Sequence, residues 1–111
     1  MNQIYTKGDV VVLPFPFSDL TNSKNRPCLI VAELSGMDII ICQITSRFRQ
    51  DSDAIKLKQK EFQKGKLNID SWIRPNKLLT IESSMVKYKL GKLKQTKIKE
   101  VEKQLCKILT R

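Results

Sequence analysis

Two polar dipeptides stand at the ends of neighbouring predicted strands: Asn25-Arg26 precedes one strand and Thr45-Ser46 follows the next. An arginine can stabilise the charge that builds on a phosphate through two parallel donors, and a hydroxyl can donate a further hydrogen bond. If the two strands pair as a hairpin, the start of one lies beside the end of the other, which brings Arg26 close to Thr45. Such a pair could cleave RNA without a metal, because the ribose 2′-OH supplies the nucleophile. The alternative is a surface arginine and an ordinary strand-end hydroxyl.

Short apolar runs separated by turn signals predict the strands that must hold these residues. The predicted strands are residues 10–13, 27–34, 38–45, 54–58, 71–74, 77–81 and 86–90. Pro14 and Pro16 are expected to end pairing on the first strand, because proline donates no ladder hydrogen bond. Residues 18–25 and 46–53 are expected to be exposed polar loops, and residues 59–64 one helical turn.

The last segment has the period of an amphipathic helix that begins near Thr96, a candidate N-cap. At helical spacing its apolar residues form one stripe, and its lysines, including Lys97, fall on the opposite, solvated face. The stripe consists of Ile98, Val101, Leu105, Ile108 and Leu109. Five to seven short strands followed by one helix predict a mainly β fold, a small and strongly bent barrel capped by the C-terminal helix. The 111 residues fit a single domain, residues 1–111.

The composition excludes several classes of site. The chain has no histidine and three cysteines without a C-x-x-C pair, so we expect no zinc site and three buried, reduced thiols. No glycine-rich nucleotide-binding loop is present, and a two-metal nuclease would need scattered carboxylates such as Asp9 and Asp19 to converge. We therefore expect no metal and no cofactor. No apolar run approaches the ~20 residues of a membrane span, and no signal peptide opens the chain, so we expect a cytoplasmic protein with no membrane partner.

The charge is unevenly distributed along the chain. The net charge is +10, but residues 1–45 carry 3 basic and 4 acidic side chains, whereas residues 46–111 carry 18 basic and 7 acidic ones. A strongly basic half suits a polyanionic partner, such as RNA, DNA or an acidic peptide. A lysine-rich solvated surface is the alternative.

An ordered series of short motifs runs through nearly the whole chain. It comprises residues 8–20 (GDVVVLPFPFSDL), 23–31 (SKNRPCLIV), 43–46 (QITS), 71–74 (SWIR), 79–82 (LTIE) and 90–93 (LGKL). The series resembles the PemK/MazF family, toxins of bacterial type II toxin–antitoxin pairs. The resemblance implies an SH3-like barrel with a C-terminal helix that works as a homodimer.

The resemblance also implies roles for individual residues. Arg26 and Thr45 match the family's proposed catalytic pair. Arg74 matches a second family arginine that binds RNA. Asn76 stands where the family has an aspartate, and the histidine that some members use with it is missing here. If Asn76 contacts RNA, it can both donate and accept hydrogen bonds, which changes the expected base preference.

Further RNA contacts are expected around this pair. Phe17 could stack on a base, Lys24 could contact a phosphate, and Ser46 could bind beside Thr45. Asp19 is expected near the RNA, and Asp19 or Glu82 could act as the general base. Phe15 and Phe17 could instead belong to the core, and Trp72 is expected in the core or in a dimer interface.

The function implied by the resemblance is an mRNA interferase. This is a sequence-specific, metal-independent endoribonuclease that cuts single-stranded RNA and leaves a 2′,3′-cyclic phosphate and a 5′-OH. The expected partners are single-stranded RNA, a cognate acidic antitoxin, a second copy of the chain and, through the antitoxin complex, operator DNA. The alternative is a non-catalytic barrel that binds RNA or an acidic peptide.

Overall fold

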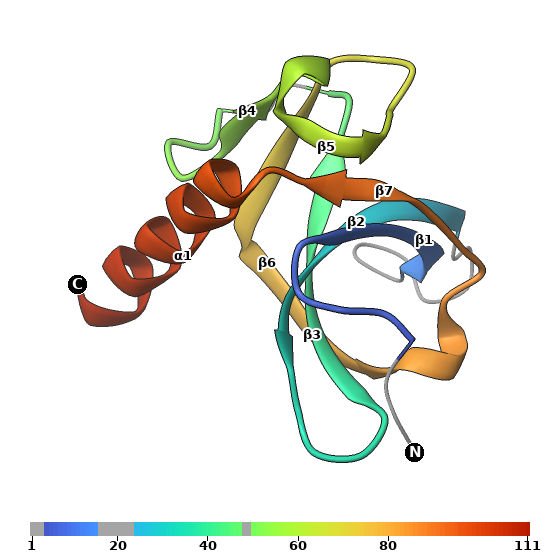
Figure 1. Cartoon of the computed structure of the whole chain (residues 1–111). Helices are drawn as coiled ribbons and strands as arrows, with labels where there is room; N and C mark the ends of the chain where they lie inside the picture. Colours follow the sequence, from blue (N-terminus) through green and yellow to red (C-terminus); the bar gives the residue numbers. More distant parts are fainter. Residues whose placement is uncertain (1–3, 16–23, 48–49) are drawn as a thin grey trace.

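The computed structural model describes residues 4–15, 24–47 and 50–111. Within these ranges seven strands form one antiparallel sheet, and a long helix follows the last strand (Figure 1). The elements are β1 (Asp9–Phe15), β2 (Lys24–Glu33), β3 (Asp38–Thr45), β4 (Ile55–Leu57), the 3₁₀ turn η1 (Gln59–Glu61), β5 (Phe62–Gly65), β6 (Ser71–Glu82), the 3₁₀ turn η2 (Ser83–Met85), β7 (Tyr88–Leu93) and α1 (Gln95–Thr110).

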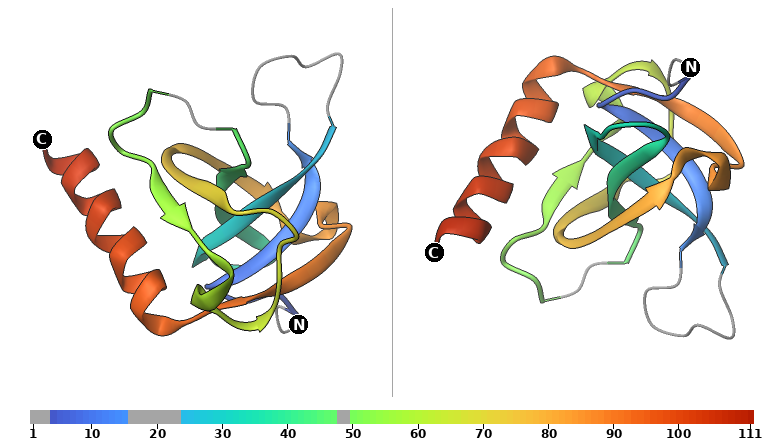
Figure 2. Two further views of the ribbon diagram at one scale, coloured as in Figure 1. Left: turned by 90° about the horizontal axis from the view of Figure 1, so that it is seen from above. Right: turned by 90° about the horizontal axis from the view of Figure 1, so that it is seen from below.

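The sheet has the order β4-β6-β3-β2-β1-β7-β5 and curls into a half-barrel. Helix α1 crosses one side of it, beside β4 and β6, as the views from above and below show (Figure 2). The expectation of a mainly β fold with a C-terminal helix is confirmed. Both hairpin strands predicted to carry Arg26 and Thr45 are present.

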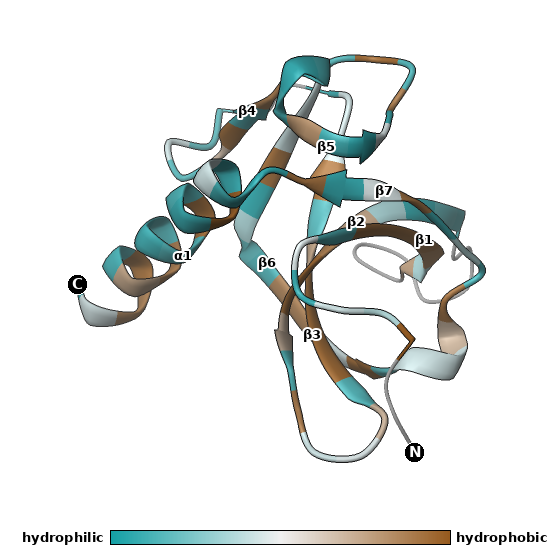
Figure 3. Ribbon diagram, viewed as in Figure 1, coloured by the Kyte–Doolittle hydropathy of each residue, from teal (hydrophilic) through white to brown (hydrophobic). Residues whose placement is uncertain are grey.

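Two apolar clusters lie on opposite faces of the sheet, because alternate residues of each strand point to opposite sides. Val10, Leu29 and Ile44 belong to the first cluster, which α1 closes with Ile98 and Val101. The second cluster lies on the other face of the sheet. Its buried members are Val11, Leu13, Phe15, Cys28, Ile30, Ile39, Ile41 and Ile81. The hydropathy colouring shows apolar stretches on β1 and β3 and hydrophilic residues over much of α1 (Figure 3).

Several strand boundaries differ from the sequence expectation. Pairing between β1 and β2 continues through Pro14 to Phe15, so the expectation that Pro14 ends it is wrong. The carbonyl of Val12 accepts from the Lys87 N–H on the other side of β1, and position 14 faces the same way. The missing N–H of Pro14 is therefore not needed by β2. Pro16 lies outside the described residues.

The region after residue 58 also differs. Residues 71–82 form one strand rather than two, because β6 absorbs Pro75 and Asn76 in a bulge opposite the Cys42–Gln43 step of β3. The expected helical turn over residues 59–64 is only η1, and residues 62–65 form the missed strand β5.

Helix α1 starts one residue before the expected N-cap, and Thr96 lies inside it. Lys97, expected on the solvated face, is buried. Its ammonium donates to Glu61 and Glu100, each at 2.7 Å, and to the Lys56 carbonyl at 3.1 Å. These acceptors satisfy the buried charge and tie α1 to η1 and β4.

The three cysteines and the tryptophan differ in burial. Cys28 and Cys42 are buried, and desolvation raises the pKa of Cys42 to about 12. Cys106 is exposed, so the expectation of three buried thiols is wrong for this residue, which lies on the outer side of α1. Trp72 is half-buried beneath the Lys56 ammonium, 5.2 Å from its ring centre. No helix in the described part of the chain is long and apolar enough to span a membrane.

Strands β5 and β7 approach each other through two glycines. A Cβ at Gly65 would lie 2.0 Å from the Leu90 carbonyl oxygen and 2.5 Å from the Gly91 Cα. Gly65 also has a φ of +73°, which side-chain-bearing residues rarely adopt. This glycine therefore fixes the point at which the chain leaves β5 toward β6.

We expect Gly65→Ala to destabilise the fold more than Gly36→Ala. Gly36 has a φ of +69° but nothing within 4 Å of its Cβ position, so Gly36→Ala measures the cost of backbone strain alone. That strain costs about 1–2 kcal/mol, and the clash at Gly65 adds about 1–3 kcal/mol. Urea unfolding of both variants measures the difference. Equal losses would show that β5 moves away from β7 without cost.

Candidate functional site

The register between β2 and β3 determines which side chains meet at one end of the sheet. Cys28 pairs with Gln43, and continuing this antiparallel register by two residues brings Arg26 opposite Thr45. On the other side of Thr45, β3 pairs with Trp72 near the start of β6. The starts of β2 and β6 and the end of β3 therefore share one edge.

A pocket of about 420 Å³ opens at this edge. This volume is within the usual range for ligand sites, about 300–1,000 Å³. Its described lining includes three cationic side chains and no carboxylate. The lining residues are Lys24, Asn25, Arg26, Pro27, Ile44, Thr45, Ser46, Arg47, Leu67, Asn68, Ile69 and Ser71. The described lining thus attracts anions, and it holds none of the carboxylates that Mg²⁺ prefers.

Arg26 has an unsatisfied donor in this pocket. Its Nε is buried and has no hydrogen-bond partner among the described residues. A buried donor without a partner is costly, on the order of 1–3 kcal/mol, and is rare in native proteins. Thr45 accepts a hydrogen bond from the Arg47 backbone N–H at 3.2 Å, and its own proton remains available to donate. A bound phosphate would give Arg26 the acceptor that it lacks.

The predicted site residues divide into three groups. Lys24, Arg26, Thr45 and Ser46 line the pocket together. Arg74 and Asn76 do not line it. Phe17 and Asp19 lie outside the described residues.

Arg74 is engaged within the protein. Its Nε donates to Asp51 Oδ2 at 2.9 Å, and its Nη1 donates to Gln43 Oε1 at 3.4 Å. The side chains of Arg74 and Asp51 are only 14% and 8% exposed. The structure therefore gives Arg74 a carboxylate partner at a distance from the cationic lining, whereas Arg26 keeps a free donor.

Asn76 bridges two aspartates on the loop between β3 and β4. Its Nδ2 donates to Asp51 Oδ1 at 3.0 Å and to Asp53 Oδ2 at 3.4 Å. An aspartate at position 76 could make neither bond when ionised, and it would add a third negative charge. Asn76, where the family pattern has an aspartate, therefore suits its two acidic neighbours, because its amide can donate to both.

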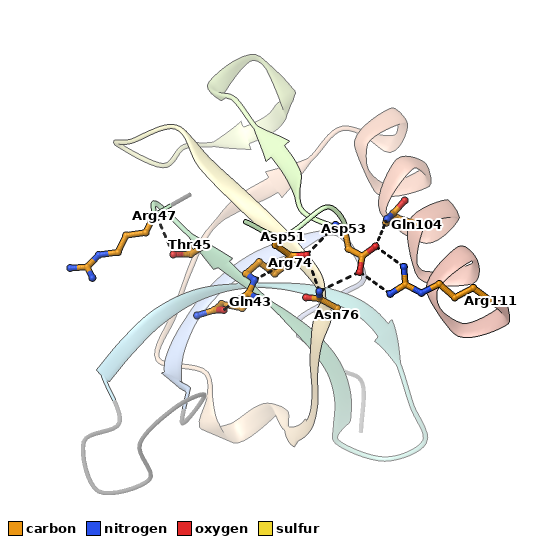
Figure 4. A network of polar contacts seen from close by, with 9 residues as sticks. All are labelled: Gln43, Thr45, Arg47, Asp51, Asp53, Arg74, Asn76, Gln104 and Arg111. Carbon is orange, nitrogen blue, oxygen red and sulfur yellow. Dashed lines mark hydrogen bonds and ion pairs between the residues drawn. The ribbon is translucent and has the colours of Figure 1, made fainter. Parts of the chain in front are cut away.

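The same network reaches the end of α1. Asp53 is 7% exposed and accepts from Arg111 at 3.0 and 3.1 Å and from Gln104 at 3.2 Å. Figure 4 shows it running from Gln43 through Arg74 and Asp51 to the helix, with Thr45 and Arg47 on the far side. The loop expected to be exposed is therefore anchored at Asp51 and Asp53, because side chains of β6, of α1 and of Arg111 just after α1 satisfy both carboxylates.

The environment of Asp51 changes its acidity. Burial raises the pKa of Asp51, but the Arg74 hydrogen bond, the Asp53 backbone N–H, the Arg74 charge and Asn76 together outweigh it, so the pKa is held below its ordinary value. Asp51 is consequently ionised at neutral pH and is a structural partner of Arg74.

Glu82 is too far away to serve the pocket. It pairs with Asp38 at the start of β3, whereas Thr45 is the last residue of that strand. Seven residues at ~3.3 Å each separate the two positions by roughly 20 Å. Glu82 is thus excluded as the general base for Arg26 and Thr45.

Residues 67–69 and Ser71 also line the pocket, and the sequence did not predict them as site residues. Ile69 is 65% exposed in spite of its apolar side chain. An apolar residue inside a short polar stretch is a weak signal, and its meaning depends on the pairing of β5 with β7. Within the ranges described, no three histidine, cysteine or acidic side chains cluster to hold a metal ion.

We expect Asp51→Asn to lower the unfolding free energy at pH 7 by about 1–3 kcal/mol, since a charge-assisted hydrogen bond is lost. The folded-state pKa of Asp51 is lowered, so its contribution is present above the unfolded pKa and disappears as pH falls through the folded one. The difference from wild type should therefore shrink below about pH 4. Urea unfolding from pH 7 to pH 2.5 measures it, with Asp70→Asn, an exposed acid, as the control. A constant difference at every pH would contradict the ion pair.

We expect Asn76→Asp to destabilise the protein at pH 7 by about 1 kcal/mol, because it places a third carboxylate beside Asp51 and Asp53. Adding Asp53→Asn to Asn76→Asp should restore part of the lost unfolding free energy, which a double-mutant cycle measures. The cycle compares unfolding free energies of the two single variants and the double variant. Independent effects would show that the two side chains do not interact.

Comparisons with known proteins identify the family and the fold of this chain. The family model of the PemK-like, MazF-like toxin of type II toxin–antitoxin systems matches residues 6–109. No curated protein matches the sequence. A MazF crystal structure from Deinococcus radiodurans has 16% identity and a TM-score of 0.77, over 99% of this chain and 100% of that one.

Two complexes are similar in fold as well. The MazE–MazF structure (Form-III) from Deinococcus radiodurans is 16% identical, with a TM-score of 0.74 over 96% of each chain. An endoribonuclease in complex with its cognate antitoxin, from a mycobacterial species, is 15% identical, with a TM-score of 0.73 over 95% of this chain and 94% of that one. These likenesses show a MazF-like fold. Because the family model matches almost the whole length of this chain, the chain belongs to the PemK-like, MazF-like toxins of type II toxin–antitoxin systems.

Proposed function

We propose that this toxin is a metal-independent endoribonuclease that cuts single-stranded RNA at specific sequences. The observation that carries the proposal is the buried, unpaired Nε of Arg26 in a cationic pocket that Thr45 also lines. Family membership supports the same class of activity, since relatives of this fold are named endoribonucleases. Its proposed place of action is the cytoplasm, where messenger RNA is translated.

The proposed reaction is a transesterification within the RNA. The 2′-oxygen forms a bond to phosphorus and loses its proton, while the bond from phosphorus to the 5′-oxygen breaks and that oxygen gains a proton. The products are a 2′,3′-cyclic phosphate and a 5′-OH. Arg26 stabilises the charge on the non-bridging oxygens, and Thr45 donates a hydrogen bond to the phosphate.

Arginine is a poor base, because its pKa lies above about 12. We therefore give Arg26 an electrostatic role and not proton abstraction. The described lining holds no carboxylate, and Asp19, outside the described residues, stays a prediction as the base. Lys24, Ser46 and the neighbouring Arg47 bind the flanking phosphates in this proposal, and Phe17 stays a predicted stacking residue. Arg74 and Asn76 stay predicted RNA contacts that would first have to leave Asp51.

The proposed partners follow from charge. A net charge of +10 and a cationic pocket suit an acidic antitoxin segment that competes with RNA. Structures of similar fold contain a cognate antitoxin. A homodimer and operator DNA bound through the antitoxin stay predictions, which light scattering and gel shift with the purified complex can test.

We expect Arg26→Ala to lower the cleavage rate at least ~10²-fold, because it removes the main stabilisation of the developing charge. The cleavage rate of Arg26→Lys should lie between those of wild type and Arg26→Ala, since lysine keeps the charge and loses the paired donors. The assay uses a long single-stranded RNA in EDTA, with 5′-OH ends mapped by sequencing. Lys99→Ala, which removes an exposed cation of α1 outside the pocket, is the control.

A folded Arg26→Ala protein that cuts at the wild-type rate would overturn the assignment. Tight RNA binding without cleavage by the wild type would instead select the alternative, a non-catalytic binding barrel. Circular dichroism of each variant separates loss of activity from loss of fold.

A further inference from the structure

We propose that residues 67–69, in the connection from β5 to β6, form a base-reading wall in which Asn68 hydrogen-bonds a nucleobase edge and Ile69 packs against the base. The inference rests on the proposed RNA cleavage and names a specificity determinant for it.

The pocket has two chemically different sides. The part contributed by β2 and the end of β3 carries the cations and hydroxyls, including Arg26 and Thr45. The part contributed by Leu67, Asn68 and Ile69 is uncharged. A nucleotide has the same division, with an anionic phosphate joined to a flat apolar base that bears donors and acceptors at its edge. If the phosphate lies against Arg26, an adjoining base faces the uncharged side.

The wall is held in place at both ends. Gln59 donates from its Nε2 to the Gly65 carbonyl at 3.1 Å and accepts from the Leu67 N–H at 3.3 Å. The Ser71 hydroxyl donates to the Ile69 carbonyl at 2.9 Å. Leu67 packs against the cluster closed by α1. The backbone that presents Asn68 is thus fixed before any ligand arrives, as a specificity element requires.

The two residues between these anchors are left open. Asn68 is exposed, and no residue in the described ranges hydrogen-bonds its carboxamide. A carboxamide donates and accepts side by side, which matches the paired groups on a base edge. Ile69, 65% exposed, offers an apolar surface beside it. Unstacked bases of single-stranded RNA are recognised through such a combination of packing and edge contacts.

The test compares the cleavage motifs of wild type, Asn68→Ala, Ile69→Ala and Gln63→Ala on a random-sequence RNA pool. Gln63, an exposed amide on β5 outside the pocket, is the matched control. We expect Asn68→Ala to relax the preference at one position by at least about fivefold, since a good paired contact discriminates by roughly 5- to 150-fold. Ile69→Ala should lower kcat/KM several-fold with the motif unchanged, and Gln63→Ala should behave as wild type.

An unchanged motif in folded Asn68→Ala would overturn the inference while leaving the endoribonuclease intact. If the wild type binds RNA without cutting it, the test compares the sequences that each variant enriches by binding instead of the sequences that it cleaves. Loss of enrichment at one position in Asn68→Ala then supports the wall, and identical enrichment overturns it. If the wild type neither cuts nor binds RNA, the proposed function and the wall both fall.

Discussion

Arg26 and Thr45 come from different strands, and the register between β2 and β3 decides whether they meet. A shift of one residue would turn every side chain of a strand to the opposite face. That shift is expensive here because both faces are buried: Leu29 and Cys42 point into one cluster, and Cys28 and Ile41 into the other. The apolar packing in the middle of the hairpin thus fixes the polar residues at its end.

This dependence explains which parts of the site could be predicted. The hairpin is local, its strands are strongly apolar, and the turn at Ser35-Gly36 leaves few alternatives, so the pairing of Arg26 with Thr45 follows from the sequence. Residues 67–69 reach the pocket only because Gly65 and Gly91 let β5 approach β7. That contact joins segments 26 residues apart, and no local pattern indicates it.

The surroundings of Arg74 were unpredictable for a different reason. Asp51 lies 23 residues before Arg74, in a stretch whose composition is typical of a solvated loop. Its burial arises from several partners acting together, namely Arg74, Asn76 and the Asp53 backbone. A single exposed ion pair contributes little, but a shielded group of this kind can anchor a loop. The same cooperation makes Asn76 a better fit than the aspartate of the family pattern.

The two-sided burial of the central strands has a consequence for the dynamics of the molecule. Strands β1, β2 and β3 are covered on both faces, whereas β4 and β5 are short and form the two edges of the sheet. Local opening requires the least free energy where few apolar contacts are lost, so amide hydrogens of β4 and β5 exchange with solvent before those of the centre. Arg26 and Thr45 therefore stand on the strands whose centres we expect to exchange most slowly, and the proposed wall is attached to a more readily opened edge.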